Sequence, residues 1–178
     1  MTLRVADYIR TDHREFERIF AALQDPQQRP LLAPVLVNLL AAHARAEEAH
    51  IYPALRSETG SGEAVAHSQE EHAEADELAA KLAALQLDDP EFDEILGKLV
   101  KAVAHHLEEE EETVLPQLDQ LSEQRQSELS RAFLELRAEI LSSTVDLTKA
   151  ELVQQAANEG IRGAESMSKA QLEREVRS

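Results

Sequence analysis

Apolar residues recur at helical spacing along most of this chain, and turn-forming sequences interrupt them at only a few points. Glycine and proline are scarce, with five and six copies in 178 residues, and runs of β-branched residues are short. This composition favours α-helices over strands. The stretches that we predict as helices cover about residues 4–23, 31–55, 63–85, 91–121 and 122–141.

The first four predicted helices are about 20 to 30 residues long and are joined by short loops, as in antiparallel bundles. Each helix carries an apolar stripe, formed for example by Leu36, Leu39 and Leu40 in the second helix. We therefore predict an all-α fold. It is an up-down-up-down four-helix bundle over residues 1–141, with an extra helix at the C-terminal end of that range.

The last part of the chain has a different composition and is predicted to be a separate unit. Residues 145–178 hold five basic and six acidic side chains, so nearly all of the net charge of −17 lies before them. Thr148 and Ser168 each begin a pattern with Glu or Gln three positions later, which is typical of a capped helix start. We predict a linker over residues 142–146 and a small helix-loop-helix tail over residues 147–178.

Charge and composition exclude several classes of function. With 35 acidic against 18 basic residues, the body of the protein should not bind nucleic acid or anionic membranes nonspecifically. The absence of cysteine excludes disulfides, thiol catalysis, iron–sulfur clusters and thiolate zinc sites. No apolar run approaches the roughly 18 residues that cross a bilayer, and the N-terminus lacks a secretory apolar segment. We therefore expect a cytoplasmic protein without a membrane partner.

Histidines interrupt the apolar stripe of each of the first four predicted helices. These histidines are His13, His43, His72 and His106. In the fourth helix two neighbouring histidines compete for the inward position, and helical phase decides between them. His106 continues the stripe of Leu99 and Val103, whereas His105 lies on the solvent face. We therefore expect one imidazole from each helix to point into the bundle.

Two glutamates accompany these histidines on the same faces. Glu47 follows His43 by four residues, and Glu110 follows His106 by four. A proline stands six residues after each glutamate and should end or kink its helix. Counted from the turns at one end of the bundle, the four histidines lie within about one helical turn of each other, at ~1.5 Å per residue. Four imidazoles and two carboxylates should therefore meet at one level of the core.

A buried cluster of this kind needs a cation. An ionised glutamate in an apolar interior costs several kcal/mol unless it is paired or bound to a metal. No Lys or Arg occupies these stripes at that level, and the donor types suit iron, manganese or zinc, with the glutamates able to bridge two ions. The alternative is a structural acidic bundle without metal. The predicted metal ligands are His13, His43, Glu47, His72, His106 and Glu110.

The pattern H…HxxxE…H…HxxxE over about residues 1–140 resembles that of the hemerythrin-like, or HHE, cation-binding family. The segments after each glutamate, Ile51-Tyr52-Pro53 and Val114-Leu115-Pro116, also resemble this family. The resemblance implies a four-helix bundle that holds two non-haem irons joined by an oxo or hydroxo bridge. It implies that Glu47 and Glu110 bridge the irons while the four histidines are terminal ligands. Zinc and manganese remain alternatives for the metal.

One feature departs from the respiratory oxygen carriers of that family, which have two histidines four residues apart on the third helix. Here Ser68 and Asp76 flank His72 at that spacing, and His67 is out of phase. Asp76, Glu71 or water would take the missing place, and we favour Asp76. A changed ligand set alters redox potential and the open position. We therefore expect handling of O2, NO or peroxide, in sensing or detoxification, rather than reversible oxygen carriage.

Several alternatives remain open at this level. If the protein is an enzyme, peroxide disproportionation is the favoured reaction; otherwise it is an iron store or a sensor that signals through its tail. The tail resembles the module at the N-terminus of transcription terminator Rho and SAP-like units, so a nucleic-acid or protein partner is open. Tyr8, Tyr52 and His50 are predicted to be packing or surface residues, with a hydrogen bond from a tyrosine hydroxyl to a ligand as the alternative.

Overall fold

The computed structural model describes residues 4–144, 167–168 and 171. The chain divides into two compact units, Met1–Leu141 and Ser142–Ser178. Most of the predicted tail lies outside the described residues. Within it, the backbone amide of Ser168 donates to Gln171 Oε1 at 2.9 Å, and Ser168 Oγ accepts from the Gln171 amide at 3.3 Å. This pair of hydrogen bonds is the capping pattern predicted at Ser168.

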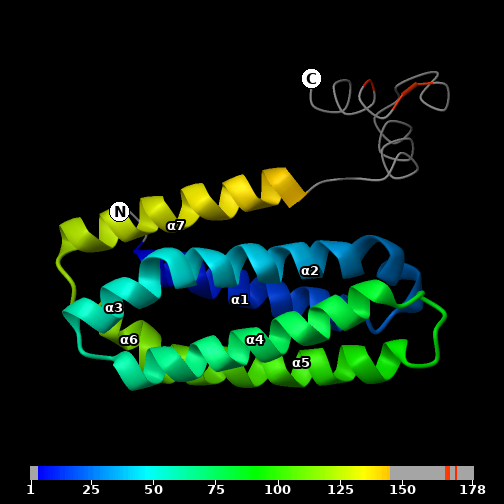
Figure 1. Cartoon of the computed structure of the whole chain (residues 1–178), viewed down its shortest axis with the longest axis horizontal. Coiled ribbons are helices and arrows are strands. Elements are labelled where there is room, and N and C mark those ends of the chain that lie inside the picture. Colours follow the sequence, from blue (N-terminus) through cyan, green and yellow to red (C-terminus); the bar gives the residue numbers. More distant parts are fainter. Residues whose placement is uncertain (1–3, 145–166, 169–170, 172–178) are drawn as a thin grey trace. The chain divides into compact units, whose positions relative to one another are not determined.

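The first unit is all-helical in its described residues, as predicted, and forms a helical bundle with one extra helix (Figure 1). The α-helices are α1 (Val5–Ala22), α2 (Arg29–Ala46), α3 (Tyr52–Glu58), α4 (Gly62–Ala84), α5 (Phe92–Glu109), α6 (Leu115–Leu118) and α7 (Glu123–Thr144). A π-helical turn joins α2 to α3 and another joins α5 to α6, so each pair continues as one rod. The four rods of the bundle are α1, α2–α3, α4 and α5–α6.

Turn chemistry at one end of the bundle explains where two rods begin. The Asp25 side chain accepts a 2.9 Å hydrogen bond from the amide of Gln27, just after α1 ends. The Asp89 side chain accepts a 2.8 Å bond from the amide of Glu91, just before α5 begins. Both are Asp-Pro turns in which the side chain replaces a backbone acceptor. At the opposite end, Gly60 has a φ of +74°, which permits the short turn between α3 and α4.

The core consists of two apolar clusters with a polar layer between them. One cluster lies toward the Asp-Pro turns and includes Phe16, Leu36 and Leu99. The other lies toward the opposite end and includes Ile9 and Val114. Since Ile9 and Phe16 flank His13 along α1, the histidine stands at the boundary of the two clusters. The α-helical periods therefore place the imidazoles in an otherwise apolar interior.

Prolines disturb the two glutamate-bearing helices, but they do not end them. The π-helical turns span Glu47–Ile51 and Glu110–Val114, and Pro53 and Pro116 follow them. A proline has no amide hydrogen and its ring crowds the preceding turn. The wider π turn absorbs that conflict, and the helices then continue to Glu58 and Leu118. The predicted kink is thus a one-turn change of helix type.

The extra helix α7 packs along the bundle rather than away from it. The Phe133 ring contacts the His43 ring edge-on, with centroids 5.9 Å apart. Arg137 reaches Asp12 on α1. Elsewhere in the bundle α4 packs against α5 (Figure 1). Along the described residues, no helix combines the length and hydropathy that crossing a membrane requires.

Candidate metal centre

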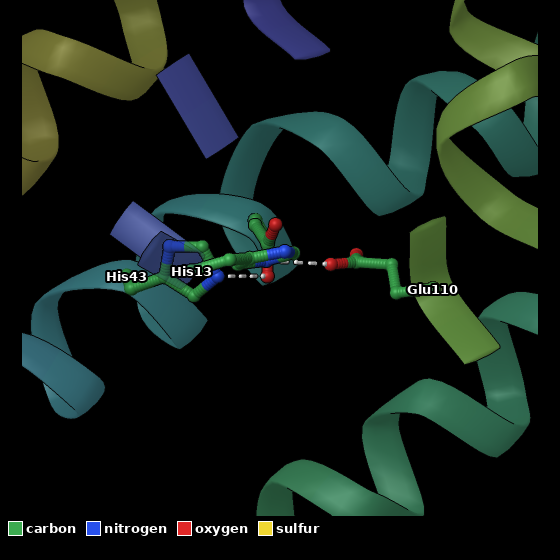
Figure 2. Close-up of side chains that lie close together, drawn as sticks. His13, His43 and Glu110 are labelled. Atoms are coloured by element: carbon green, nitrogen blue, oxygen red, sulfur yellow. Dashed lines mark ion pairs between the residues drawn. The ribbon is translucent and has the colours of Figure 1, made fainter. Parts of the chain in front are cut away.

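All six side chains selected from the sequence meet in the polar layer of the bundle. His13, Glu47 and Glu110 have no exposed surface, and the remaining three histidines are at most 5% exposed. Figure 2 shows His13 and His43 pointing toward the bundle interior, with Glu110 approaching from another helix. The expected convergence is therefore present in the structure. It brings together side chains from α1, α2, α4 and α5 and from both π-helical turns.

Their ligand atoms form two groups that share one glutamate. His13, His43, Glu47 and Glu110 offer atoms within 4.8 Å of one another, and so do Glu47, His72 and His106. Glu47 Oε2 lies 3.3 Å from His43 Nε2 and 3.5 Å from His72 Nε2. Glu110 Oε2 lies 3.3 Å from His13 Nε2 and 3.9 Å from His106 Nε2. Each carboxylate therefore faces imidazoles from two different helices.

The outer nitrogen of every one of these imidazoles faces a carboxylate. The Nδ1–carboxylate pairs are His13–Glu111 at 2.9 Å, His43–Asp12 at 3.1 Å, His72–Glu48 at 3.2 Å and His106–Glu71 at 2.9 Å. An ionised carboxylate only accepts hydrogen bonds, so each Nδ1 carries the proton. Each Nε2 is then unprotonated, and its lone pair points into the centre. Carboxylates in this position also orient metal-binding histidines.

Several inward-facing atoms are left without partners. His13 Nε2, His43 Nε2, Glu47 Oε1 and Glu110 Oε2 are buried and accept or donate no hydrogen bond within the described residues. His72 Nε2 and His106 Nε2 lie 3.0 Å apart. With both protons on Nδ1, no hydrogen stands between these two nitrogens. Buried polar atoms without partners are costly, and a cation would satisfy them. The donor set therefore fits a metal.

Burial and mutual repulsion act against the charged forms of the two glutamates. Burial and the negative charge of Glu110 raise the pKa of Glu47 well above its ordinary value. Burial also acts against the charged form of Glu110, but close contact with the His13 ring and with the other nearby imidazoles lowers its pKa to about 2. Burial lowers the pKa of His43 to about 4 although Asp12 opposes this shift. A bound cation would favour the charged form of Glu47.

Tyr52 is part of the centre, which is the alternative to the packing role favoured for it from the sequence. Its hydroxyl donates a 3.0 Å hydrogen bond to Glu110 Oε1 and lies 3.3 Å from His72 Nε2 and 3.5 Å from Glu47 Oε2. Its ring stacks on His72, with centroids 5.5 Å apart. Burial and the two glutamates raise the pKa of Tyr52 well above its ordinary value. The phenol oxygen therefore faces ligand atoms of three candidate ligands.

The π-helical turn explains why sequence periodicity did not select Tyr52. It follows Glu47 by five residues, and in an α-helix that spacing places two side chains on different faces. A π turn closes with hydrogen bonds five residues apart. The Tyr52 amide bonds to the Glu47 carbonyl, so the two residues return to the same face. The signal in the sequence was Pro53, which required some irregularity in that turn.

The structure does not place Asp76 at the position of the missing histidine. Asp76 is exposed and lines a small cavity beside His43, His72 and His106. Glu71 faces Nδ1 of His106, on the outer side of that ring. Tyr52 contacts the inward atoms instead. The cavity has a volume of about 20 Å³, which is room for a molecule about the size of water.

Asp12 connects the extra helix to the centre. Arg137 on α7 donates two hydrogen bonds to the Asp12 carboxylate, at 2.7 and 2.8 Å. Asp12 in turn accepts from Nδ1 of His43. Arg14 similarly pairs with Glu111, the partner of His13. Arginines therefore pair with two of the four outer carboxylates, Asp12 and Glu111.

A helical bundle with buried imidazoles and carboxylates facing one another defines a metal-binding bundle protein. Comparison with known proteins gives the particular family. The chain belongs to the hemerythrin HHE cation-binding domain family, whose model matches residues 4–118. The family resemblance predicted from the histidine and glutamate spacing is thereby confirmed.

Two individual proteins are similar to this chain. A DNA nickase from Nostoc sp. is 32% identical over 115 residues, which cover 63% of this chain and 32% of the nickase. The chain thus spans about a third of the length of that relative. A crystal structure of a hemerythrin HHE cation-binding domain-containing protein from Mycobacterium kansasii has a TM-score of 0.69 at 16% identity. That match covers 92% of this chain and 97% of the other, and it shows the same fold.

Proposed function

We propose that the chain binds two iron ions through the six predicted ligands and handles a small molecule, O2, NO or peroxide, at that centre. The observation that supports this most is the set of buried Nε2 and carboxylate atoms without partners in the described structure. The two ligand groups, which share Glu47, favour two ions over one. Membership of a cation-binding family supports the same conclusion. Zinc and manganese accept the same donor types.

The residues around the centre fix its ligands and its charge. Carboxylates on all four Nδ1 atoms hold the imidazoles in the tautomer that leaves Nε2 free. Glu47 and Glu110 supply the negative charge, and Glu47 releases its proton when a cation binds. The Tyr52 hydroxyl donates a hydrogen bond to Glu110 Oε1, and its oxygen faces the centre. Iron, when bound, supplies redox chemistry toward a small oxygen or nitrogen ligand.

The size of the nearby cavity restricts the substrate. The cavity beside His43, His72 and His106 holds about 20 Å³ and has mostly apolar lining residues, such as Phe16 and Val103. A small uncharged molecule fits this space, whereas a metabolite of several carbon atoms does not. This favours a diatomic molecule or hydrogen peroxide. In the enzymatic version of the proposal, two peroxide molecules are converted to one dioxygen and two waters.

Metal analysis of the purified chain, combined with its ultraviolet–visible spectrum, tests the proposal directly. We expect about two irons per chain and oxygen-to-iron charge-transfer bands. Glu110→Gln should lose most of the iron, and Glu108→Gln, which changes an exposed neighbour, should keep it. One zinc per chain with a featureless spectrum, or equal iron in both variants, would contradict the proposal.

A peroxide assay separates catalysis from storage or sensing. The iron-loaded chain should evolve oxygen from hydrogen peroxide, and Glu110→Gln prepared in the same way should not. If the loaded chain keeps its iron and evolves no oxygen, the centre serves as a sensor or store. In that case the peroxide-disproportionating version is wrong while the di-iron assignment stands.

A further inference from the structure

A second cluster of histidines and glutamates lies on the outer side of α4 and α5. It is built from two identical patterns, each with a histidine followed four residues later by a glutamate. The members are His67 and Glu71 on α4 and His105 and Glu109 on α5. Residues four apart share a helix face, and α4 packs against α5. The two patterns therefore lie next to each other across these helices.

His67, Glu71 and Glu109 offer ligand atoms within 4.8 Å of one another, and His105 contacts both carboxylates. His67 Nε2 lies 2.9 Å from Glu109 Oε2 and 3.7 Å from Glu71 Oε1. His105 Nε2 lies 3.7 Å from Glu71 Oε1 and 3.5 Å from Glu109 Oε1. Each imidazole therefore faces both carboxylates, and each carboxylate faces both imidazoles. Side chains paired only along their own helix would not form these cross-helix contacts.

Glu71 has a buried oxygen whose surroundings suit a bound cation. Its Oε2 atom accepts the Nδ1 proton of His106 at 2.9 Å. Its Oε1 atom is buried and has no hydrogen-bond partner in the described part of the chain. That oxygen lies between His67 and His105, at 3.7 Å from each ring nitrogen. A buried carboxylate oxygen that faces two imidazoles is a position that a cation would satisfy.

We propose that His67, Glu71 and Glu109, whose ligand atoms lie within 4.8 Å of one another, form with the adjacent His105 a second metal site, outside the buried centre, for a divalent transition-metal ion. Two imidazoles and two carboxylates suit zinc, cobalt(II), iron(II) and manganese(II), whereas magnesium and calcium prefer oxygen ligands alone. The His67 and His105 side chains are 55% and 61% exposed. A cation at this site therefore reaches solvent directly and exchanges readily.

This outer site stands on its own residues and does not depend on the chemistry proposed for the buried centre. The two sites are linked through one carboxylate, because Glu71 faces the outer imidazoles with Oε1 and His106 with Oε2. His105 and His106 are neighbours in sequence and serve the outer and inner sites respectively. The solvent-facing position predicted for His105 is thus a ligand position in a site that the sequence analysis did not consider.

Calorimetric titration of the full chain with Zn²⁺ alone tests the outer site. The chain is first loaded at the centre and desalted, so that only exchangeable cation is measured. We expect Glu109→Gln to weaken this binding at least about tenfold, which is the smallest cost typical of losing even a supporting group in a metal site. Glu108→Gln is the matched control and should bind as the unchanged chain does. Equal affinity in the two variants, or no exchangeable Zn²⁺ in the unchanged chain, would overturn the proposal.

Two further measurements distinguish loss of the outer site from unfolding and from loss of the buried centre. The double variant H67N/H105N changes exposed side chains, so its melting temperature should stay the same while exchangeable Zn²⁺ binding is lost. H50N is its control, because His50 is a partly exposed histidine outside the cluster. In H43A, which removes a buried ligand, the exchangeable Zn²⁺ should persist. Its persistence separates the outer site from the di-iron proposal, so that either can fail alone.

Discussion

The Nε2 atoms of His72 and His106 face each other at 3.0 Å in the centre of the bundle. Glu48 and Glu71 hold the protons of these rings on the opposite nitrogens, at 3.2 and 2.9 Å. Two lone pairs at that distance repel each other unless a cation lies near both. The arrangement of these two rings therefore suits a centre that holds a cation.

Removal of the metal should lower stability. A ligand that binds only the folded state stabilises it by about 2.7 kcal/mol when its free concentration is one hundred times its dissociation constant. We expect chelation to lower the melting temperature by several degrees, measured by differential scanning calorimetry, and re-addition of iron to restore it. In H43A, chelation should cause little further change. An equal melting temperature for loaded and stripped unchanged chain would contradict this prediction.

Glu47→Gln should change how the metal-free chain responds to pH. The pKa of Glu47 is raised in the folded state, so its stabilising contribution is complete below the unfolded value near 4.3 and is lost as pH rises toward the folded value. Glutamine resembles the protonated carboxyl and does not ionise. At pH 8 the metal-free E47Q chain should therefore be more stable than the unchanged chain, by roughly 1 kcal/mol or more.

The measurement for Glu47 is urea unfolding of both metal-free chains at pH 5 and pH 8. The stability advantage of E47Q should be larger at pH 8, while its metal binding is lost at both values. E108Q, at an exposed position, should follow the unchanged chain at each pH. An advantage that shrinks as the pH rises would show that Glu47 is ionised in the metal-free fold.

Asp12→Asn should weaken metal binding without removing a ligand. Asp12 accepts the Nδ1 proton of His43 and is held by two hydrogen bonds from Arg137. Loss of such a supporting carboxylate typically costs about 10- to 100-fold in metal affinity. Arg137→Gln should have a smaller effect in the same direction, because Asp12 remains. A metal competition titration measures both, and Arg131→Gln on the same helix is the control. Full affinity in D12N would contradict the prediction.

Arg137→Gln should also move acid unfolding to higher pH. Burial acts against the charge on Asp12, but the hydrogen bonds and charges of His43 and Arg137 bring its net pKa below the ordinary value. Its stabilising contribution is therefore present above the unfolded value near 3.9 and is lost as pH falls through the folded value. Without Arg137 the folded pKa rises and that loss begins sooner. Circular dichroism during acid titration measures the midpoint; an unchanged midpoint would mean that Arg137 does not hold the charge on Asp12.

Tyr52→Phe should alter the centre while preserving the packing of its ring. The variant removes the 3.0 Å hydrogen bond to Glu110 and leaves the stacking on His72 in place. We expect a changed visible spectrum of the iron-loaded chain and about tenfold or greater loss of iron affinity. Tyr8→Phe, which changes a partly buried tyrosine packed on the apolar cluster, should alter neither. Identical spectra for Y52F and the unchanged chain would indicate that Tyr52 has only a packing role.

Sequence periodicity was sufficient to bring six side chains together because helical phase is a local property. The spacing of His106 after Leu99 and Val103 decided that this ring is buried and that His105 is not, and the structure agrees. The same phase argument failed for Tyr52, since one π turn changes the angle between residues five apart. It also favoured Asp76, whose side chain is exposed.

The sequence by itself determined the helices, the inward-facing histidines and glutamates, and the need for a cation, because period and charge are carried by neighbouring residues. Only the tertiary structure decided which groups surround those ligands. Arg137 and Asp12 are 125 residues apart in the chain, and Tyr52 and Glu110 are 58 apart. Such pairs depend on how whole helices pack against one another, and no local pattern encodes that distance. The outer contacts of Glu71 with His67 and His105 were settled in the same way.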